Sequence, residues 1–308
     1  ICFTPTASGV YTFILEATDA CGLKGRDTAV ITVTINEPPV CHLPNDTSIF
    51  QCTATEVCLP VSATDPNGNF KSCQILTGPG SLVNGNWCYT PNADQTVNVV
   101  IKCEDSSGAY CQGSFTVVFN VNQSPTIAFG NDTTIFQCAS QQVCVPYTVS
   151  DPENNITLEQ LISGNGTIDT VLNKVCFTPT GAGVYTFIAK ATDACGLADF
   201  DTINVTININ HPPVASAGAD QNKFQCTPAP ICWPASCSDV DGNLATCALV
   251  SNTGIYNGTN ICFTPTASGV YTFILEATDA CGAKGRDTAL ITVTLNAPPI
   301  CNMPPDTN

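Results

Sequence analysis

One four-residue motif recurs along the chain and fixes its organisation. Cys-Phe/Tyr-Thr-Pro stands at 2–5, 88–91, 176–179 and 262–265, at spacings of 86, 88 and 86 residues. Self-similarity at a fixed period indicates an array of structural units. The spacing predicts three whole repeats, preceded by the end of a fourth and followed by the start of a fifth, with boundaries at 1–36, 37–122, 123–210, 211–296 and 297–308.

A longer period overlies the first. Residues 1–41 match residues 261–301 at 36 of 41 positions, an offset of 260, whereas neighbouring repeats match far less well. Three unlike repeats therefore form one unit of 260 residues, and that unit itself recurs. We expect the chain to be a segment of a longer array.

Each repeat is expected to consist of β-strands. Along 10–17 and 28–35 successive side chains alternate with period two, and β-branched and aromatic residues are frequent. This pattern, bounded by Gly, Pro and Asn, is typical of strands, and no convincing amphipathic helix is found. Seven short strands in about 87 residues predict a sandwich of two sheets.

The repeats resemble the immunoglobulin-like superfamily of tandem surface modules, and specifically the cadherin-like, hyalin and polycystic-kidney-disease-type repeats of prokaryotic extracellular proteins. Ser8-Gly9-Val10-Tyr11 is similar to the tyrosine corner of such domains, and Tyr185 and Tyr271 repeat it. Repeat 37–122 departs from the pattern, with Val97 at the tyrosine position. The resemblance implies an all-β fold of tandem immunoglobulin-like sandwiches; it is weak as a guide to activity.

The composition excludes several classes of function. The formal charge is −16, with 9 Lys+Arg against 25 Asp+Glu, so the chain lacks the cations that bind nucleic acid. The sequence contains no run of 18 apolar residues, which is the length needed to span a membrane. The 20 Cys include no Cys-x-x-Cys pair and are accompanied by only two His. Zinc binding by these cysteines is therefore disfavoured. Disulfides are expected instead, and they indicate an oxidising compartment, either outside the cell or in the interior of a thermophile.

Placing the cysteines on this sandwich topology predicts pairs within each repeat. The start of strand B lies beside the end of strand E, close enough for a disulfide. The expected bonds are Cys58–Cys88, Cys144–Cys176 and Cys232–Cys262, and the competing choice is the hairpin bond Cys138–Cys144 with its equivalents. We also expect Cys237–Cys247 around the B–C loop and Cys73–Cys103 between strands C and F.

The remaining cysteines lie at opposite ends of a sandwich, too far apart to bond within it. In a head-to-tail array they would meet across linkers, which predicts Cys52–Cys195, Cys138–Cys281 and, because Ser107 replaces the F–G loop cysteine, Cys226–Cys301. An alternative is that Cys41 pairs inside its own repeat with Cys111. The unit 37–296 holds 17 Cys. This number is odd, so one cysteine of each recurring unit has no disulfide partner along the chain, and Cys111 is expected to be free or to bond another chain.

No catalytic constellation is apparent, so we expect no enzyme. Both His lie in linkers, and no acid pair or phosphate-binding loop is visible. No cofactor is required, but calcium is a candidate because acidic B–C and F–G loops share one end of each sandwich. The candidate ligands are Asp239, Asp241, Asn243, Asp279, Asp65, Asp105, Asp151 and Asp193, beside the linker residues Asn36, Asn122, Asn210 and Asn296. The alternative is ordinary turn chemistry, in which Asp and Asn side chains bond nearby backbone.

Two further features concern the surface and the core. Candidate glycosylation sites in Asn-x-Ser/Thr sequons are Asn45, Asn122, Asn131, Asn155, Asn165, Asn204 and Asn257. Trp87 and Trp233 each adjoin a disulfide cysteine, and core packing is favoured over a sugar-binding platform.

These observations favour a structural protein. The chain is expected to be the repeat region of an extracellular filament, stalk or sheath at the cell surface, stiffened by disulfides within and between repeats, whose partners are copies of itself. The alternative is a calcium-dependent adhesin or glycan-binding module that holds cell-surface glycans. A third interpretation is the spacer of a larger secreted enzyme.

Overall fold

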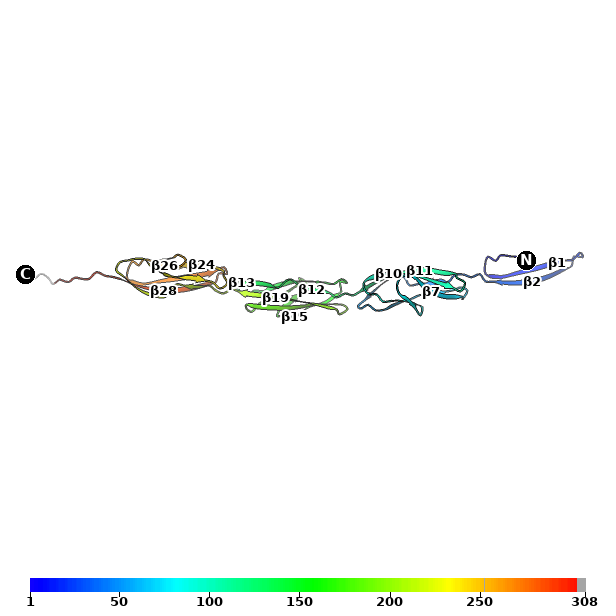
Figure 1. Ribbon diagram of the computed structural model, residues 1–308, viewed down its shortest axis with the longest axis horizontal. Helices are drawn as coiled ribbons and strands as arrows, with labels where there is room; N and C mark the ends of the chain where they lie inside the picture. Colours follow the sequence, from blue (N-terminus) through cyan, green and yellow to red (C-terminus); the bar gives the residue numbers. More distant parts are fainter. Residues whose placement is uncertain (252, 304–308) are drawn as a thin grey trace, which may run out of the picture. The chain divides into compact units, whose positions relative to one another are not determined.

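The computed structural model describes residues 1–251 and 253–303 and consists of strands joined by turns and loops (Figure 1). The expected last segment, 297–308, therefore lies partly outside the described residues. Alpha-carbon contacts divide the chain into two units. Unit 1 comprises Ile1–Pro125, Ser150–Thr157 and Thr192–Ala198, and unit 2 comprises Thr126–Val149, Leu158–Ala191 and Asp199–Asn308.

Residues 1–36 form a two-stranded antiparallel hairpin. Its strands are β1 (Gly9–Thr18) and β2 (Lys24–Val33), close to the expected ranges. Leu15 is 63% exposed, whereas Leu275, in the nearly identical sequence of repeat 211–296, is fully buried. The difference arises because residues 1–36 contribute strands of one sheet only, so the apolar face has no second sheet to pack on.

The segment 37–122 forms a two-layered sandwich. One layer has the order β4-β11-β10-β7, and the other consists of the sheets β3-β6 and β5-β9-β8. The strands are β3 (Val40–His42), β4 (Thr47–Gln51), β5 (Val57–Pro60), β6 (Ser62–Thr64), β7 (Phe70–Thr77), β8 (Ser81–Val83), β9 (Asn86–Tyr89), β10 (Gln95–Asp105) and β11 (Tyr110–Val121).

The segment 123–210 repeats this arrangement with the sheets β12-β14-β17-β16 and β13-β19-β18-β15. The strands are β12 (Thr126–Phe129), β13 (Thr133–Gln137), β14 (Val143–Ser150), β15 (Ile156–Ser163), β16 (Thr167–Asp169), β17 (Lys174–Phe177), β18 (Gly183–Asp193) and β19 (Ala198–Ile209).

The segment 211–296 has the sheets β21-β28-β27-β24, β20-β23 and β22-β26-β25. The strands are β20 (Val214–Ser216), β21 (Gln221–Gln225), β22 (Ile231–Pro234), β23 (Ser236–Ser238), β24 (Leu244–Leu249), β25 (Ile255–Tyr256), β26 (Asn260–Phe263), β27 (Gly269–Asp279) and β28 (Lys284–Leu295).

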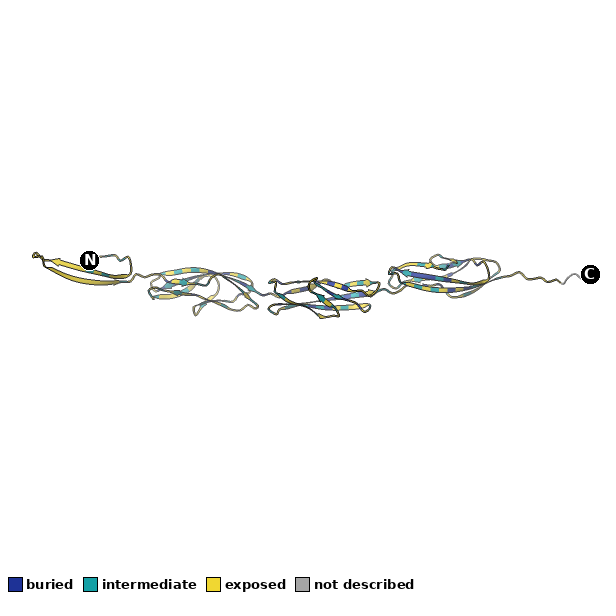
Figure 2. Cartoon of the chain, turned by 180° about the vertical axis from the view of Figure 1, so that it is seen from behind, coloured by how far each residue is buried: buried dark blue, intermediate teal, exposed yellow. Residues whose placement is uncertain are grey.

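Each sandwich has its own core, and the three core clusters lie within 37–122, 123–210 and 211–296 respectively. Figure 2 shows the alternation of buried and exposed residues along the long strands, as period-two side chains require. Trp87 and Trp233 are buried and donate their indole N–H to the carbonyls of Pro79 and Ala217, so core packing, not a sugar platform, is confirmed.

Two recurring details match the immunoglobulin-like pattern. The hydroxyls of Tyr11, Tyr185 and Tyr271 each donate to the carbonyl four residues earlier, at 2.7, 2.9 and 2.9 Å, which forms the expected tyrosine corner. In every sandwich the short second strand runs parallel to the last one: β4 with β11, β13 with β19 and β21 with β28. The last residue of these short strands leads directly into the functional region described next.

Candidate functional site

The proposed calcium ligands gather at three joints, each made of a linker and two loops of the repeat that follows it. The linker begins with an asparagine. The B–C loop and the F–G loop each begin with an aspartate. The joints comprise linker residues 36–37, 122–123 and 210–211, B–C loops 65–69, 151–155 and 239–243, and F–G loops 105–109, 193–197 and 279–283.

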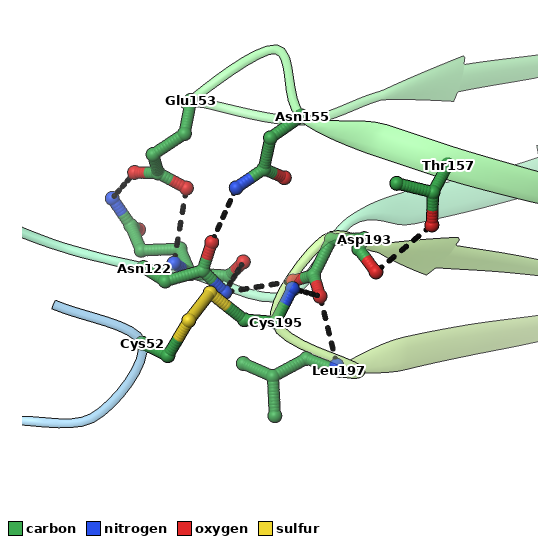
Figure 3. Close-up of a disulfide and its surroundings, with 9 residues drawn as sticks. Cys52, Asn122, Glu153, Asn155, Thr157, Asp193, Cys195 and Leu197 are labelled. Atoms are coloured by element: carbon green, nitrogen blue, oxygen red, sulfur yellow. Dashed lines mark hydrogen bonds between the residues drawn. A yellow bond between two sulfur atoms is a disulfide. The ribbon is translucent and has the colours of Figure 1, made fainter. Parts of the chain in front are cut away.

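The second joint is centred on the buried side chain of Asn122 (Figure 3). Its Nδ2 donates to Asp193 Oδ2 at 2.7 Å and to the carbonyl of Gln123 at 3.1 Å. Its Oδ1 accepts from Asn155 Nδ2 at 2.6 Å. Both amide hydrogens and the amide oxygen are thus bonded, as a buried polar group requires.

The same asparagine clamp, as we name this linker asparagine with its two loop partners, recurs at the other joints. Asn36 Nδ2 donates to Asp105 and Asn36 Oδ1 accepts from Asn69, both at 2.7 Å. Asn210 does the same with Asp279 and Asn243, again at 2.7 Å. Three joints of different sequence therefore share one polar geometry.

The residue after the asparagine adds a further bond. Its backbone N–H donates to the side chain two residues after the B–C aspartate: Glu37 to Asn67 at 2.7 Å, Gln123 to Glu153 at 3.0 Å and His211 to Asp241 at 2.6 Å. Amide and carboxylate side chains serve equally because the position needs only an acceptor oxygen.

The linker asparagine is also fixed to the repeat before it. The backbone N–H of Asn122 donates to the carbonyl of Gln51 at 2.9 Å, and Asn210 donates to Gln137 at 3.0 Å. The residue after each glutamine is a cysteine whose disulfide ends in the F–G loop: Cys52–Cys195 and Cys138–Cys281, each spanning 143 residues with a Cα–Cα distance of 5.3 Å. A hydrogen bond and a covalent bond thus flank the same linker.

The loop aspartates are held by backbone N–H groups. Asp193 Oδ1 accepts from the backbone of Cys195 and Leu197, both at 2.9 Å. In the B–C loops, Asp65, Asp151 and Asp239 accept at Oδ1 from the N–H two residues later, at 2.8, 2.9 and 2.8 Å. These bonds from aspartate side chains to nearby backbone are the turn chemistry that is the alternative to calcium binding.

Hydrogen bonding also sets the protonation of the F–G aspartates. The Asn36 amide, ahead of the opposing effect of burial, lowers the pKa of Asp105, and the Asn210 amide does the same for the pKa of Asp279. Burial acts to raise the pKa of Asp193, but its bonds from Asn122 and the F–G backbone outweigh this, so that pKa is lowered too. All three side chains are carboxylates near neutral pH.

The structure contains eight disulfides among its described residues. Seven are pairs expected from the sequence: Cys58–Cys88, Cys144–Cys176, Cys232–Cys262, Cys52–Cys195, Cys138–Cys281, Cys237–Cys247 and Cys73–Cys103. The first three join directly opposed residues of β5 and β9, of β14 and β17, and of β22 and β26.

The eighth disulfide corrects two expectations. Cys41 bonds Cys111, with a Cα–Cα distance of 5.8 Å, so Cys111 is not the free thiol and the expected Cys226–Cys301 bond is absent. Cys226 and Cys301 are both free and exposed. The bond is the alternative left open by the sequence, in which Cys41 pairs inside its own repeat; β3, which carries Cys41, lies within bonding distance of the start of β11.

The sequons differ in accessibility. Asn45, Asn131, Asn165 and Asn257 are exposed. The amide nitrogens of Asn122 and Asn155 are used within the second joint, and that of Asn204 donates to Asp132 at 3.0 Å. Asn122 and Asn155 are therefore unsuitable as glycan acceptors in the folded chain.

Sequence reasoning missed the central role of the linker asparagines. The signal for them is their spacing, because Asn36, Asn122, Asn210 and Asn296 recur at the same 86, 88 and 86-residue intervals as the cysteine motif. The acceptor positions Asn67 and Glu153 carried no signal, because their chemistry varies between repeats.

No protein-family model matches the sequence. Among curated proteins, the chain is 25% identical over 324 residues to the dyslexia-associated protein KIAA0319 homolog of Rattus norvegicus; the match covers 92% of this chain and 29% of that protein. The chain thus spans less than a third of the curated relative it matches.

Among solved structures, the protocadherin gammaB7 EC3–6 cis-dimer structure has a TM-score of 0.56 at 12% identity, covering 93% of this chain and 85% of that one. Mouse cadherin-23 EC22–24 has a TM-score of 0.51 at 16% identity, covering 85% and 100%. The sandwiches have the fold of cadherin ectodomain repeats. At these identities the likeness concerns the fold alone. The described residues include no helix that could cross a bilayer.

Proposed function

We propose that the chain is the repeat region of an extracellular cell-surface protein of the adhesion type. Three features support this: the cadherin-like fold, the disulfide content, which suits an oxidising compartment, and the joints closed by linker-crossing disulfides. Cys52–Cys195 and Cys138–Cys281 carry the proposal, because a covalent bond beside a linker removes the relative motion that neighbouring domains otherwise show. Rigid joints transmit force between an anchored end and a bound end.

The partner we propose is a second copy of the chain. One of the solved structures with this fold is described as a cis-dimer, so sandwiches of this architecture can associate with their own kind. No catalytic role is proposed.

Self-association is tested by coating beads of two colours with the chain and counting mixed aggregates under shear. We expect mixed aggregates that resist shear, and weaker resistance when both linker-crossing disulfides are removed by C52S/C195S and C138S/C281S. A matched control, C58S/C88S with C144S/C176S, removes two disulfides but keeps the joints. Beads that stay dispersed would refute self-adhesion, and binding only to cells with intact surface glycans would favour the glycan-binding alternative.

A filament or sheath is a second candidate, favoured by one observation. Residues 1–41 and 261–301 are identical at 36 of 41 positions, so this part of the 260-residue unit recurs almost without change, as expected of a polymer built for length. Electron microscopy of concentrated protein separates the two candidates: uniform filaments that form without beads or cells support the filament, whereas dispersed single molecules support the adhesion module.

A further inference from the structure

The joints offer a test of whether calcium fits the residues that suggested it. Calcium takes about six to eight oxygen ligands that converge on one point. Among the described residues, the groups of three or more closely spaced Cys, His, Asp or Glu are Cys41, Cys103, Cys111 and Glu56, Cys58, Cys88. Both are built around disulfide sulfurs, and neither contains the joint aspartates.

The oxygens that do face the linkers already have N–H partners. At the second joint, Asp193 Oδ1 accepts two backbone N–H groups and Oδ2 accepts the Asn122 amide. Asp241, the second acid of the B–C loop 239–243, accepts the backbone N–H and the Nδ1 of His211 at 2.6 and 3.2 Å. These carboxylate oxygens are therefore engaged as hydrogen-bond acceptors and are not arranged as calcium ligands.

Two oxygen atoms at the second joint would be available to a cation. Asp151 Oδ2 and Asn155 Oδ1 are buried without a hydrogen-bond partner in the described structure. Two oxygens fall well short of a calcium shell. Neither belongs to the linker, whose own amide groups are all bonded.

We propose that the three joints close without a metal ion, and that the linker asparagine takes the role that a shared cation would have. Its amide is the one small side chain that suits the position, because it donates to the F–G aspartate and accepts from the B–C asparagine at the same time. An aspartate in its place would set two carboxylates against each other. Glutamine would extend the amide by one carbon.

The proposal goes beyond the proposed function and is independent of it, because a metal-free joint suits an adhesion module and a filament equally. It predicts that the whole chain has the same melting temperature in a chelator and in millimolar calcium, and that calorimetry finds no calcium binding. A calcium ion held at about 100 times its dissociation constant would raise the melting temperature by about 10 °C or more. Such a rise, or calorimetric binding lost in D193N, would overturn the proposal.

Two leucine variants test the asparagine itself. In N122L the backbone amide of Gln123 should exchange its hydrogen about tenfold faster or more, because hydrogen bonds to a charged group are lost, and equally so in calcium and in chelator. The matched control N131L, at an exposed asparagine, should leave that exchange unchanged. Exchange in N122L that calcium slows to the wild-type rate would show that an ion closes the joint. If N122L fails to fold, calorimetry of the wild-type chain decides alone.

Discussion

Removing the disulfide Cys138–Cys281 should destabilise the segment 211–296 by about 4 kcal/mol. If that sandwich unfolds while the preceding one stays folded, the bond closes a loop from the linker at Asn210 to Cys281. A loop of about 70 residues costs the unfolded chain roughly 15 cal/mol/K, or about 4.4 kcal/mol at 25 °C. With a denaturant slope of about 3 kcal/mol/M, the guanidinium midpoint of C138S/C281S should fall by about 1.3 M.

The chain provides its own probes for this measurement. Its two tryptophans, Trp87 and Trp233, are buried in the first and third sandwiches. Unfolding followed by fluorescence should therefore show the Trp233 transition shifted in C138S/C281S and the Trp87 transition unmoved.

The matched control is C52S/C195S, which removes a disulfide of the same 143-residue separation at the second joint. It should leave the Trp233 transition in place. An equal shift of Trp233 in both variants would mean a general effect of losing any disulfide, and no shift in either would refute the claim that these bonds tie neighbouring sandwiches together.

Three further expectations concern acid, thiols and glycans. The pKa values of Asp105, Asp193 and Asp279 are lowered below their ordinary 3.8, so their stabilisation is complete above that value and lost as pH falls through the lowered pKa. Limited proteolysis at the linkers should therefore accelerate only at pH values below 3.8, and acid-insensitive cleavage would contradict this. Within 37–296, alkylation of the unreduced protein should label Cys226 alone, with labelling of Cys111 as the contrary result. Expressed through a secretory pathway, the chain should carry any glycans at Asn45, Asn131, Asn165 or Asn257, and a glycan on Asn122 or Asn155 would show that the second joint is open.

The sequence predicted the sandwich because its signals are local and repeated. The alternation along 10–17 specifies a strand whatever surrounds it, and the recurrence of Ser/Ala-Gly-Val-Tyr places the tyrosine corner in every repeat except 37–122, which has Val97 at that position. The bond Cys144–Cys176 was favoured over the hairpin bond Cys138–Cys144 by topology, since the start of one strand lies beside the end of its antiparallel neighbour, and the structure places these two cysteines directly opposite each other.

The joints were less predictable because they depend on which groups donate and which accept. Asp and Asn in facing loops suit a cation and a hydrogen-bonded network equally, and the sequence does not tell where the Asn122 amide lies. The odd cysteine shows the same limit: the count of 17 in the unit predicted one cysteine without a partner, but only the positions of β3 and β11 moved that role from Cys111 to Cys226.

The first joint differs from the other two, and the difference is measurable. Its F–G loop carries Ser107 where the others carry Cys195 and Cys281, and the Ser107 hydroxyl bonds Asp105 at 2.8 Å, so the loop keeps its shape without sulfur. A disulfide of the linker-crossing kind cannot end on this loop, and the asparagine clamp of Asn36 closes the joint with hydrogen bonds alone.

The backbone amides of Glu37, Gln123 and His211 make the equivalent bond at the three joints, and their exchange rates report joint opening. In the wild-type chain Glu37 should exchange fastest. C52S/C195S should bring Gln123 toward the Glu37 rate and leave His211 protected, because each disulfide supports only the linker it crosses. Equal protection of all three amides in the wild-type chain would mean that hydrogen bonds, and not the disulfides, determine how firmly these joints are closed.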